Sequence, residues 1–394
     1  MRVCIRVFGI VQGVGFRPTV KRHADACDIA GSVSNKGPYV EIFAEGSEEC
    51  VYSFIKQIQE EPPKRAVILK LDVENVESGE DGIHKVESET DSKEKFQIIE
   101  SEKEEGEIFV SPDIAICPEC KKELYDKNDR RYLHPFINCT CCGPRLTILD
   151  SMPYDRVRTS MGKFPMCEKC EYEYTHAETR RFDAQPVCCN DCGPEVYLLG
   201  RKERGADAIR YTRKVISEGG IVAVKGIGGF HLCCDAAKEE TVARLRQRKK
   251  RPMKPFAVMM KDLDVVRREC ETEPHLEEIL DGHQKPIILL PKKEGGTLCE
   301  SVAPDNPKIG VMLPYAPVQL LLFDYQDETK VSDCLVMTSA NTSGAPNHIR
   351  LSPVKIHNRV IRTKPYFPVM GKNYVTKPGK FTQCIFIVPA DRCT

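Results

Sequence analysis

The sequence predicts an α+β protein built from three unlike parts, and three observations lead to this prediction. Residues 1–100 show strand and helix patterns in the order β-α-β-β-α-β. Four Cys-x-x-Cys pairs follow between residues 111 and 195. From residue 203 onward, amphipathic helices alternate with short apolar strands, which is the pattern of an α/β domain. A chain of 394 residues is long enough for two to four domains.

The first part, residues 1–100, has the element order of a ferredoxin-like split βαβ fold. Residues 3–8 alternate as a strand, and a glycine-rich turn leads into a helix over 18–30, with Pro18 in its first turn. The further elements expected here are strands at 32–34 and 40–44, a helix at 48–60, and strands at 66–73 and 96–99. Residues 77–107 are rich in Glu, Ser, Lys and Gly, so most of them are expected to form a solvated connection.

The cysteine pairs of residues 111–195 form a two-fold repeat, because a shift of fifty residues superimposes all eight cysteines. Pairs at this spacing are typical of Cys₄ zinc sites, so the repeat predicts two structural zinc ions. Pairing within each repeat is the simplest arrangement, and an interlaced arrangement fits the spacing too. A closed shell of four thiolates leaves no position for a substrate. The predicted ligands are Cys117, Cys120, Cys139, Cys142, Cys167, Cys170, Cys189 and Cys192.

Composition indicates where such a protein works. The chain contains 20 cysteines, but its first residues lack the apolar core and cleavage site of a signal peptide. No stretch reaches the ~18 apolar residues of a membrane span. We therefore expect a reducing, cytoplasmic location with no membrane partner. The formal net charge is zero, and the arginine pairs at 130–131 and 180–181 of the repeat have acidic residues nearby, so no nucleic-acid partner is expected.

The third part, residues 203–346, is predicted to be an α/β domain. The expected helices cover 208–218, 238–250 and 318–325, and the expected strands cover 221–225, 256–260, 286–290 and 334–338. A basic run follows the second helix, at residues 244–254. It fits a solvated helix end, an RNA or localisation patch, or a site for nucleotide phosphates.

The glycine-rich turn near the amino terminus fits an anion site. Three glycines between a strand and a helix expose backbone N–H groups at the helix N-terminus. Arg17 adds a planar fork that matches phosphate oxygens, and Asn35 on the following hairpin could orient an attacking water. A glycine turn without further signals is more often only a turn.

The sequence of this turn and of the hairpin after it resembles the acylphosphatase signature: GIVQGVGFR at residues 9–17, followed by GSVSN at 31–35. The resemblance implies that Arg17 binds a phosphoryl group and that Asn35 positions the hydrolytic water. It also implies a phosphate-binding loop formed by Gln12, Gly13, Val14, Gly15 and Phe16.

The whole stretch to about residue 346 resembles the HypF family of hydrogenase-maturation carbamoyltransferases. The resemblance rests on CPEC at 117–120, NCTCCGPR at 138–145 and QPVCC at 185–189. It rests also on VKGIGGFHL at 224–232, KKRPMKPF at 249–256 and TSANTSG at 338–344, which are similar to the YrdC-type domain. This implies a site for ATP and a carbamoyl group at Lys249, Arg251, Lys254, Ser339 and Asn341. His231 is expected to be a core residue.

The family resemblance implies that carbamoyl phosphate is cleaved at the first site. The carbamate would then react with ATP, taken with Mg²⁺, to give carbamoyl adenylate for transfer to the C-terminal cysteine of HypE. Residues 347–394 depart from the family pattern, so a divergent or truncated tail, an incomplete third domain and a missing transfer domain are expected. The alternative is a zinc-stapled RNA- or protein-binding module with acylphosphatase activity only, or none.

Overall fold

The computed structural model describes residues 1–76, 95–101, 111–227, 229–340 and 382–388. Its contacts divide the chain into two compact units, Met1–Asp113 with Asn138–Val187 and Ile114–Ile137 with Cys188–Thr394. The predicted finger region at 111–195 contributes residues to both units. Among the described residues, no helix has the length and apolar character needed to cross a membrane.

The first unit contains a five-stranded sheet in the order β4-β1-β3-β2-β5. β1 pairs antiparallel with β3 and β4, and β5 pairs parallel with β2. The predicted element order is confirmed, with ends shifted by a few residues. The elements are β1 (Arg2–Ile10), α1 (Phe16–Ala26), β2 (Ala30–Asn35), β3 (Tyr39–Glu45), α2 (Glu48–Glu60), β4 (Val67–Asn75) and β5 (Phe96–Ile98).

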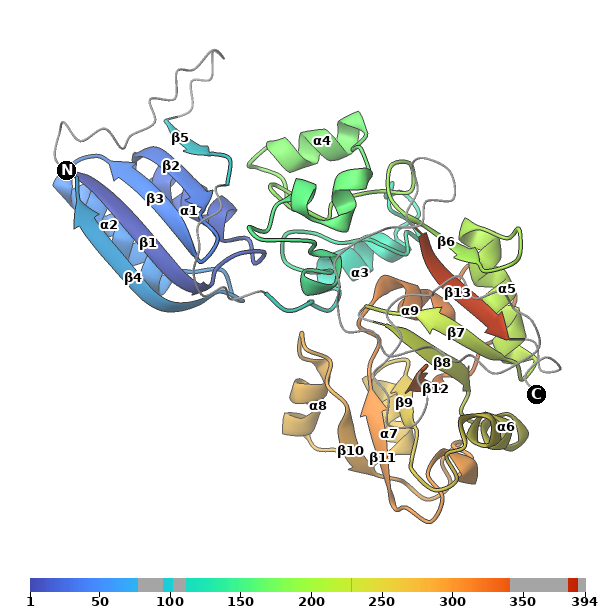
Figure 1. Ribbon diagram of the computed structural model, residues 1–394. Coiled ribbons are helices and arrows are strands. Elements are labelled where there is room, and N and C mark those ends of the chain that lie inside the picture. Colours follow the sequence, from blue (N-terminus) through green and yellow to red (C-terminus); the bar gives the residue numbers. More distant parts are fainter. Residues whose placement is uncertain (77–94, 102–110, 228, 341–381, 389–394) are drawn as a thin grey trace. The chain divides into compact units, whose positions relative to one another are not determined.

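Helices α1 and α2 cover one face of this sheet (Figure 1). Alternating residues of β1 point into the core, and Val3, Ile5 and Val7 are almost wholly buried. They pack with Val20 of α1 and Phe54 of α2. Each such side chain contributes roughly 1.5–3 kcal/mol of burial. This core fixes the end of β1 and the start of α1, the two elements that hold the glycine turn.

The cysteine repeat folds as two copies of one local pattern. In each copy a short helix begins directly after the first cysteine and contains the second, α3 (Pro118–Tyr125) and α4 (Glu168–Thr175). Arg131 donates from Nε to the carbonyl of Cys188 in the second unit, and Arg181 donates to that of Asn138 in the first. Both arginines are buried. Three short 3₁₀ helices lie between the copies, at Leu146–Ile148, Arg156–Arg158 and Ser160–Lys163.

The second unit contains an eight-stranded mixed sheet in the order β10-β11-β9-β12-β8-β7-β13-β6. Its strands are β6 (Glu195–Leu198), β7 (Ile221–Lys225), β8 (Phe230–Asp235), β9 (Ala257–Met260), β10 (Ile288–Pro291), β11 (Lys308–Met312), β12 (Cys334–Ser339) and β13 (Thr382–Val388). Besides α3, its helices are α5 (Gly205–Ser217), α6 (Glu239–Lys249), α7 (Leu263–Glu269), α8 (Pro274–Asp281), α9 (Pro317–Phe323) and a 3₁₀ turn at Glu300–Val302. Helix α5 packs along β6 and β7 (Figure 1).

The predicted helices and strands of this α/β part are confirmed, but several elements were missed. Strands β8 and β11 and helices α7 and α8 had no predicted counterpart. The tail contributes β13, which pairs parallel with β6 and antiparallel with β7. A strand from residues 347–394 therefore lies inside the sheet, where the sequence predicted no element.

Candidate functional site

The glycine turn of the first unit places Arg17 and Asn35 beside one pocket. Gly13 and Gly15 both have positive φ angles, and Gly15 precedes the first residue of α1. Because of this turn, backbone N–H groups lie at the helix N-terminus, where the helix dipole favours an anion. Arg17 lies in the first turn of α1 and Asn35 ends β2. Both side chains are buried.

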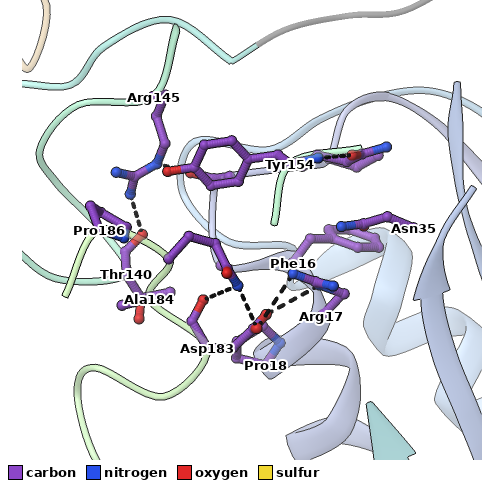
Figure 2. Close-up of a pocket in the computed structure, with 15 residues that line it drawn as sticks. Phe16, Arg17, Pro18, Asn35, Thr140, Arg145, Tyr154, Asp183, Ala184 and Pro186 are labelled. Carbon is purple, nitrogen blue, oxygen red and sulfur yellow. Dashed lines mark hydrogen bonds and ion pairs between the residues drawn. The ribbon is translucent and has the colours of Figure 1, made fainter. Parts of the chain in front are cut away.

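The pocket encloses about 310 Å³, including its opening to solvent. Figure 2 shows that its walls come from the glycine turn and from the finger segments of the same unit. The predicted loop residues Gln12, Gly13, Gly15 and Phe16 line it, together with Arg17 and Asn35. Val14 is buried in the core below the loop instead. The finger segments add Thr140, Arg145, Tyr154, Asp183, Ala184, Gln185 and Pro186.

Asn35 brings an unused acceptor to this pocket. Its side chain is 1% exposed, and its Oδ1 has no hydrogen-bond partner. A buried polar atom without a partner costs free energy, so such atoms are rare away from sites that bind a ligand or water. Gln12 holds the neighbouring hairpin turn by donating from Nε2 to the carbonyl of Gly37, 2.9 Å away. Asn35 therefore presents its amide oxygen from a firmly held strand end.

Arg17 is paired with two carboxylates that the sequence analysis missed. Its Nη1 lies 3.0 Å from Asp155 Oδ1, and its Nε lies 3.1 Å from Asp183 Oδ2. Burial alone would lower the pKa of Arg17, but Asp183 and Asp155 outweigh it and leave that pKa raised. Burial also raises the pKa of the Asp183 carboxyl. The sequence did contain one indication that Asp183 has a role of its own: the matching position in the first copy of the repeat is Leu133, an apolar residue.

A second arginine fixes the glycine turn to the finger segment. Arg145 is 2% exposed and donates to the carbonyl of Gly13. Its guanidinium also donates to the carbonyls of Thr140 at 2.8 Å and Pro144 at 2.9 Å. Tyr154 lies under the guanidinium, with the ring centre 5.9 Å from its central carbon. A side chain at Gly13 would meet both Arg145 and Tyr154, so this approach requires a glycine.

The eight predicted cysteine ligands form two sets of four. Cys117, Cys120, Cys139 and Cys142 make one set, and Cys167, Cys170, Cys189 and Cys192 make the other. Within each set all sulfur atoms lie within 4.8 Å of one another, which suits a tetrahedral ion. Pairing within each repeat is confirmed, and the interlaced arrangement is excluded. Four soft thiolates fit structural zinc, which would hold the loops together and offer no open position to a substrate.

The predicted nucleotide site of the second unit is only partly described. Lys249 ends α6 and donates to the carbonyl of Ser339, 2.7 Å away. Arg251 donates from Nε to the carbonyl of Lys254 at 3.1 Å. Asn341 lies outside the described residues. The structure therefore brings Lys249 to Ser339, and it holds Arg251 and Lys254 in the adjoining turn.

Electrostatics distinguish two residues near this site. Burial, with a contribution from Arg251, lowers the pKa of Lys249 to about 8. Burial, together with Lys225, lowers the pKa of His231. His231 lies opposite Ser339 in the pairing of β8 and β12, and its Nδ1 has no hydrogen-bond partner. His231 is half-buried rather than a closed core residue.

Three family models match the chain. The Acylphosphatase model matches residues 3–87, and the HypF finger model matches 116–149 and 166–199. The Sua5/YciO/YrdC model, which carries the description telomere recombination, matches residues 214–360. The fold, the glycine-turn site and the cysteine sets thus define a protein with an acylphosphatase domain, HypF-type fingers and a YrdC-like α/β domain. The predicted fold class is confirmed.

Known relatives share this arrangement. A probable carbamoyltransferase HypF of Methanocaldococcus jannaschii is 46% identical over 352 residues, which are 88% of this chain and 44% of that protein. HypF2 of Cupriavidus necator is 43% identical, over 88% of this chain and 43% of that protein. A crystal structure of full-length HypF, in a phosphate- and nucleotide-bound form, matches with a TM-score of 0.79 and 45% identity, over 88% of this chain and 44% of that one.

The chain is strongly homologous to HypF carbamoyltransferases over 88% of its own length. The match spans less than half of the length of these curated relatives. The crystal structure of HypF from T. kodakarensis shows the same relation, with a TM-score of 0.76 and 42% identity over 88% of this chain and 43% of that one.

Proposed function

We propose that this chain carries out the first two steps of HypF-type carbamoyl transfer, the cleavage of carbamoyl phosphate and the formation of carbamoyl adenylate. One observation carries the proposal: Arg17 and the unpartnered Oδ1 of Asn35 line one pocket at the glycine turn. A phosphoryl group needs a cation and backbone N–H donors, and its hydrolysis needs an acceptor that orients water. The homology to HypF proteins supports the same assignment.

In the first step, the N–H groups of the glycine turn and the guanidinium of Arg17 bind the phosphoryl oxygens. Asn35 Oδ1 accepts a hydrogen bond from a water and aims its oxygen at phosphorus. The new P–O bond forms as the bond to the carbamoyl oxygen breaks, and carbamate leaves with that electron pair. The remaining water proton passes to solvent or to the products. Positioning and charge stabilisation are all that this chemistry asks of the protein.

In the second step, the carbamate oxygen attacks the α-phosphorus of ATP in the second unit, and pyrophosphate leaves. Lys249, Arg251 and Lys254 would neutralise the phosphates, Ser339 and Asn341 would bind the carbamoyl side, and Mg²⁺ would accompany ATP. The carbamoyl group would then pass to the C-terminal cysteine of HypE. Thiolate-based zinc sites suit a reducing compartment such as the cytoplasm.

The test measures phosphate release from carbamoyl phosphate by the full chain. Arg17→Ala should lower kcat/KM by about a hundredfold or more, the usual cost of removing one donor to a developing charge. Arg22→Ala is the matched control, because Arg22 lies exposed on the same helix and should leave the rate unchanged. Equal rates for wild type and Arg17→Ala would overturn the assignment of this site.

A parallel measurement with ATP present follows pyrophosphate release. Lys249→Met should abolish carbamoyl-phosphate-dependent pyrophosphate release. Lys250→Asn should retain it, because Lys250 is exposed and Asn tolerates its positive φ angle. Absence of both products, with salt-sensitive RNA binding, would favour the binding-module alternative.

A further inference from the structure

The carboxylate of Asp183 occupies the face of Arg17 that a phosphoryl group requires. Asp183 Oδ2 lies 3.1 Å from Nε of Arg17, and Oδ1 lies 3.4 Å from Nη2. These two donors form the parallel pair through which arginine holds an oxyanion at two points. Asp155 and Ser101 take only Nη1, at 3.0 Å and 3.2 Å.

The two carboxylates differ in their relation to the pocket. Asp183 lines it, and Figure 2 shows its carboxylate meeting Arg17 at the pocket wall. Asp155 is not one of the lining residues, and its second oxygen pairs with Arg158 at 2.9 Å. A carboxylate that merely orients an arginine is expected behind it. Asp155 fits that role, whereas Asp183 lies where a ligand would bind.

The repeat shows that the backbone does not demand an aspartate here. Leu133 is the counterpart of Asp183, and both residues have a positive φ angle. Their N–H groups make matching hydrogen bonds, Leu133 to the carbonyl of Leu124 and Asp183 to that of Tyr174. The scaffold accepts an uncharged side chain at this position. The carboxylate of Asp183 is therefore explained by its contact with Arg17.

We propose that Asp183 is a specificity-determining residue of the phosphoryl site, because its carboxylate competes with the incoming phosphoryl group for Arg17. This inference rests on the proposed phosphoryl-binding role of Arg17. Arg17 already faces two negative charges, so a phosphoryl dianion binds only when Asp183 gives up its contacts. An anion that makes too few contacts in the pocket does not displace the Asp183 carboxylate from Arg17. Inorganic phosphate, the product, is therefore held weakly and leaves readily.

The experiment measures the affinity of the full chain for inorganic phosphate by calorimetry. Asp183→Asn keeps an acceptor for Gln185, whose Nε2 lies 2.7 Å from Asp183 Oδ1, and removes the competing charge. It should tighten phosphate binding about ten- to a hundredfold, the factor expected for releasing a charge-assisted hydrogen bond. Asp155→Asn is the matched control and should change the affinity by less than about threefold, because it leaves the two-point face occupied.

Other results would overturn the inference. Unchanged or weaker phosphate binding in Asp183→Asn would show that Asp183 orients Arg17 instead of competing for it. An equal gain in Asp155→Asn would show that only the total charge matters. Asp183→Gly replaces Asp183→Asn if the latter gives no cooperative melt, because glycine adopts the positive φ angle without strain. Adding Arg17→Ala to either variant should remove the gain.

The same variants separate this inference from the proposed function. If wild type hydrolyses carbamoyl phosphate but Asp183→Asn gains no affinity for phosphate, the function stands and the competition is refuted. If Asp183→Asn gains affinity but no variant hydrolyses carbamoyl phosphate, the anion competition stands and the proposed reaction fails.

Discussion

Arg145 offers a test of whether the finger segment shapes the phosphoryl site. Replacing Arg145 with Met removes the donor to the Gly13 carbonyl and the donors to four carbonyls of residues 139–144. Met fills part of the volume but offers no donor. The glycine turn then loses its tie to the finger loop, so we expect its N–H groups to be less well placed for a phosphoryl group.

The structure gives the size of the effect. Removing one side of a buried charged network costs about 3–5 kcal/mol, less than the sum of its separate bonds because they act together. A displacement of about 1 Å in a group that positions substrate can cost about a hundredfold in rate. We therefore expect Arg145→Met to lose about 3–5 kcal/mol of stability and to raise KM for the acyl phosphate at least tenfold.

Arg156 supplies the matched control. It is buried too, and its guanidinium donates to the carbonyls of Gln185, Val187 and Phe164, which lie outside the glycine turn. Arg156→Met should lose comparable stability in a thermal melt and keep the wild-type KM at a temperature where it is folded. If both variants raise KM equally, general loosening explains the effect. If neither does, the link from Arg145 to Gly13 has no role in substrate binding.

Three further results are expected. Asn35→Ala should lower kcat about a hundredfold with little change in KM, because the amide oxygen serves the attacking water; a change confined to KM in steady-state kinetics would contradict this. Metal analysis should find two zinc ions per chain. The Cys120→Ser variant should lose one of them and melt at a lower temperature. Full zinc content with an unchanged melting temperature would refute the zinc site that contains Cys120. The pKa of Lys249 is lowered to about 8, so Lys249 loses its charge between about pH 7 and pH 9. ATP affinity measured by calorimetry should therefore fall across that range in wild type but not in Lys249→Arg. A flat wild-type profile would refute the role of Lys249.

The parts of the site that the sequence predicted are local in the chain. The glycine turn, Arg17 and the eight cysteines follow from strings of a few residues whose geometry is set by near neighbours. Cys117 illustrates this, since its sulfur accepts a hydrogen bond from the N–H of Cys120 at the start of α3. The strands and helices of the first unit likewise followed from periodicity.

The missed parts arise from contacts between distant segments. Asp155 and Asp183 lie 138 and 166 residues from Arg17 in the chain, and Arg145 lies 132 residues from Gly13. No spacing rule links such positions, because their proximity depends on how the finger segments pack. Strand β13 was missed for the same reason, since its place between β6 and β7 follows the long stretch 341–381, which lies outside the described residues.

Comparing the two copies of the repeat distinguishes residues that maintain the fold from residues that line the pocket. Arg131 and Arg181 occupy matching positions and make matching bonds to the residue before a ligand cysteine, so they serve the fold of each copy. The polar residues that line the pocket break this symmetry, because Asp183 corresponds to Leu133 and Arg145 corresponds to Glu195. Leu133 and Asp183 share a positive φ angle, so the backbone of the repeat does not require the change between them. These differences face Gly13 and Arg17, one from each copy, so both copies contribute a residue to the proposed phosphoryl site.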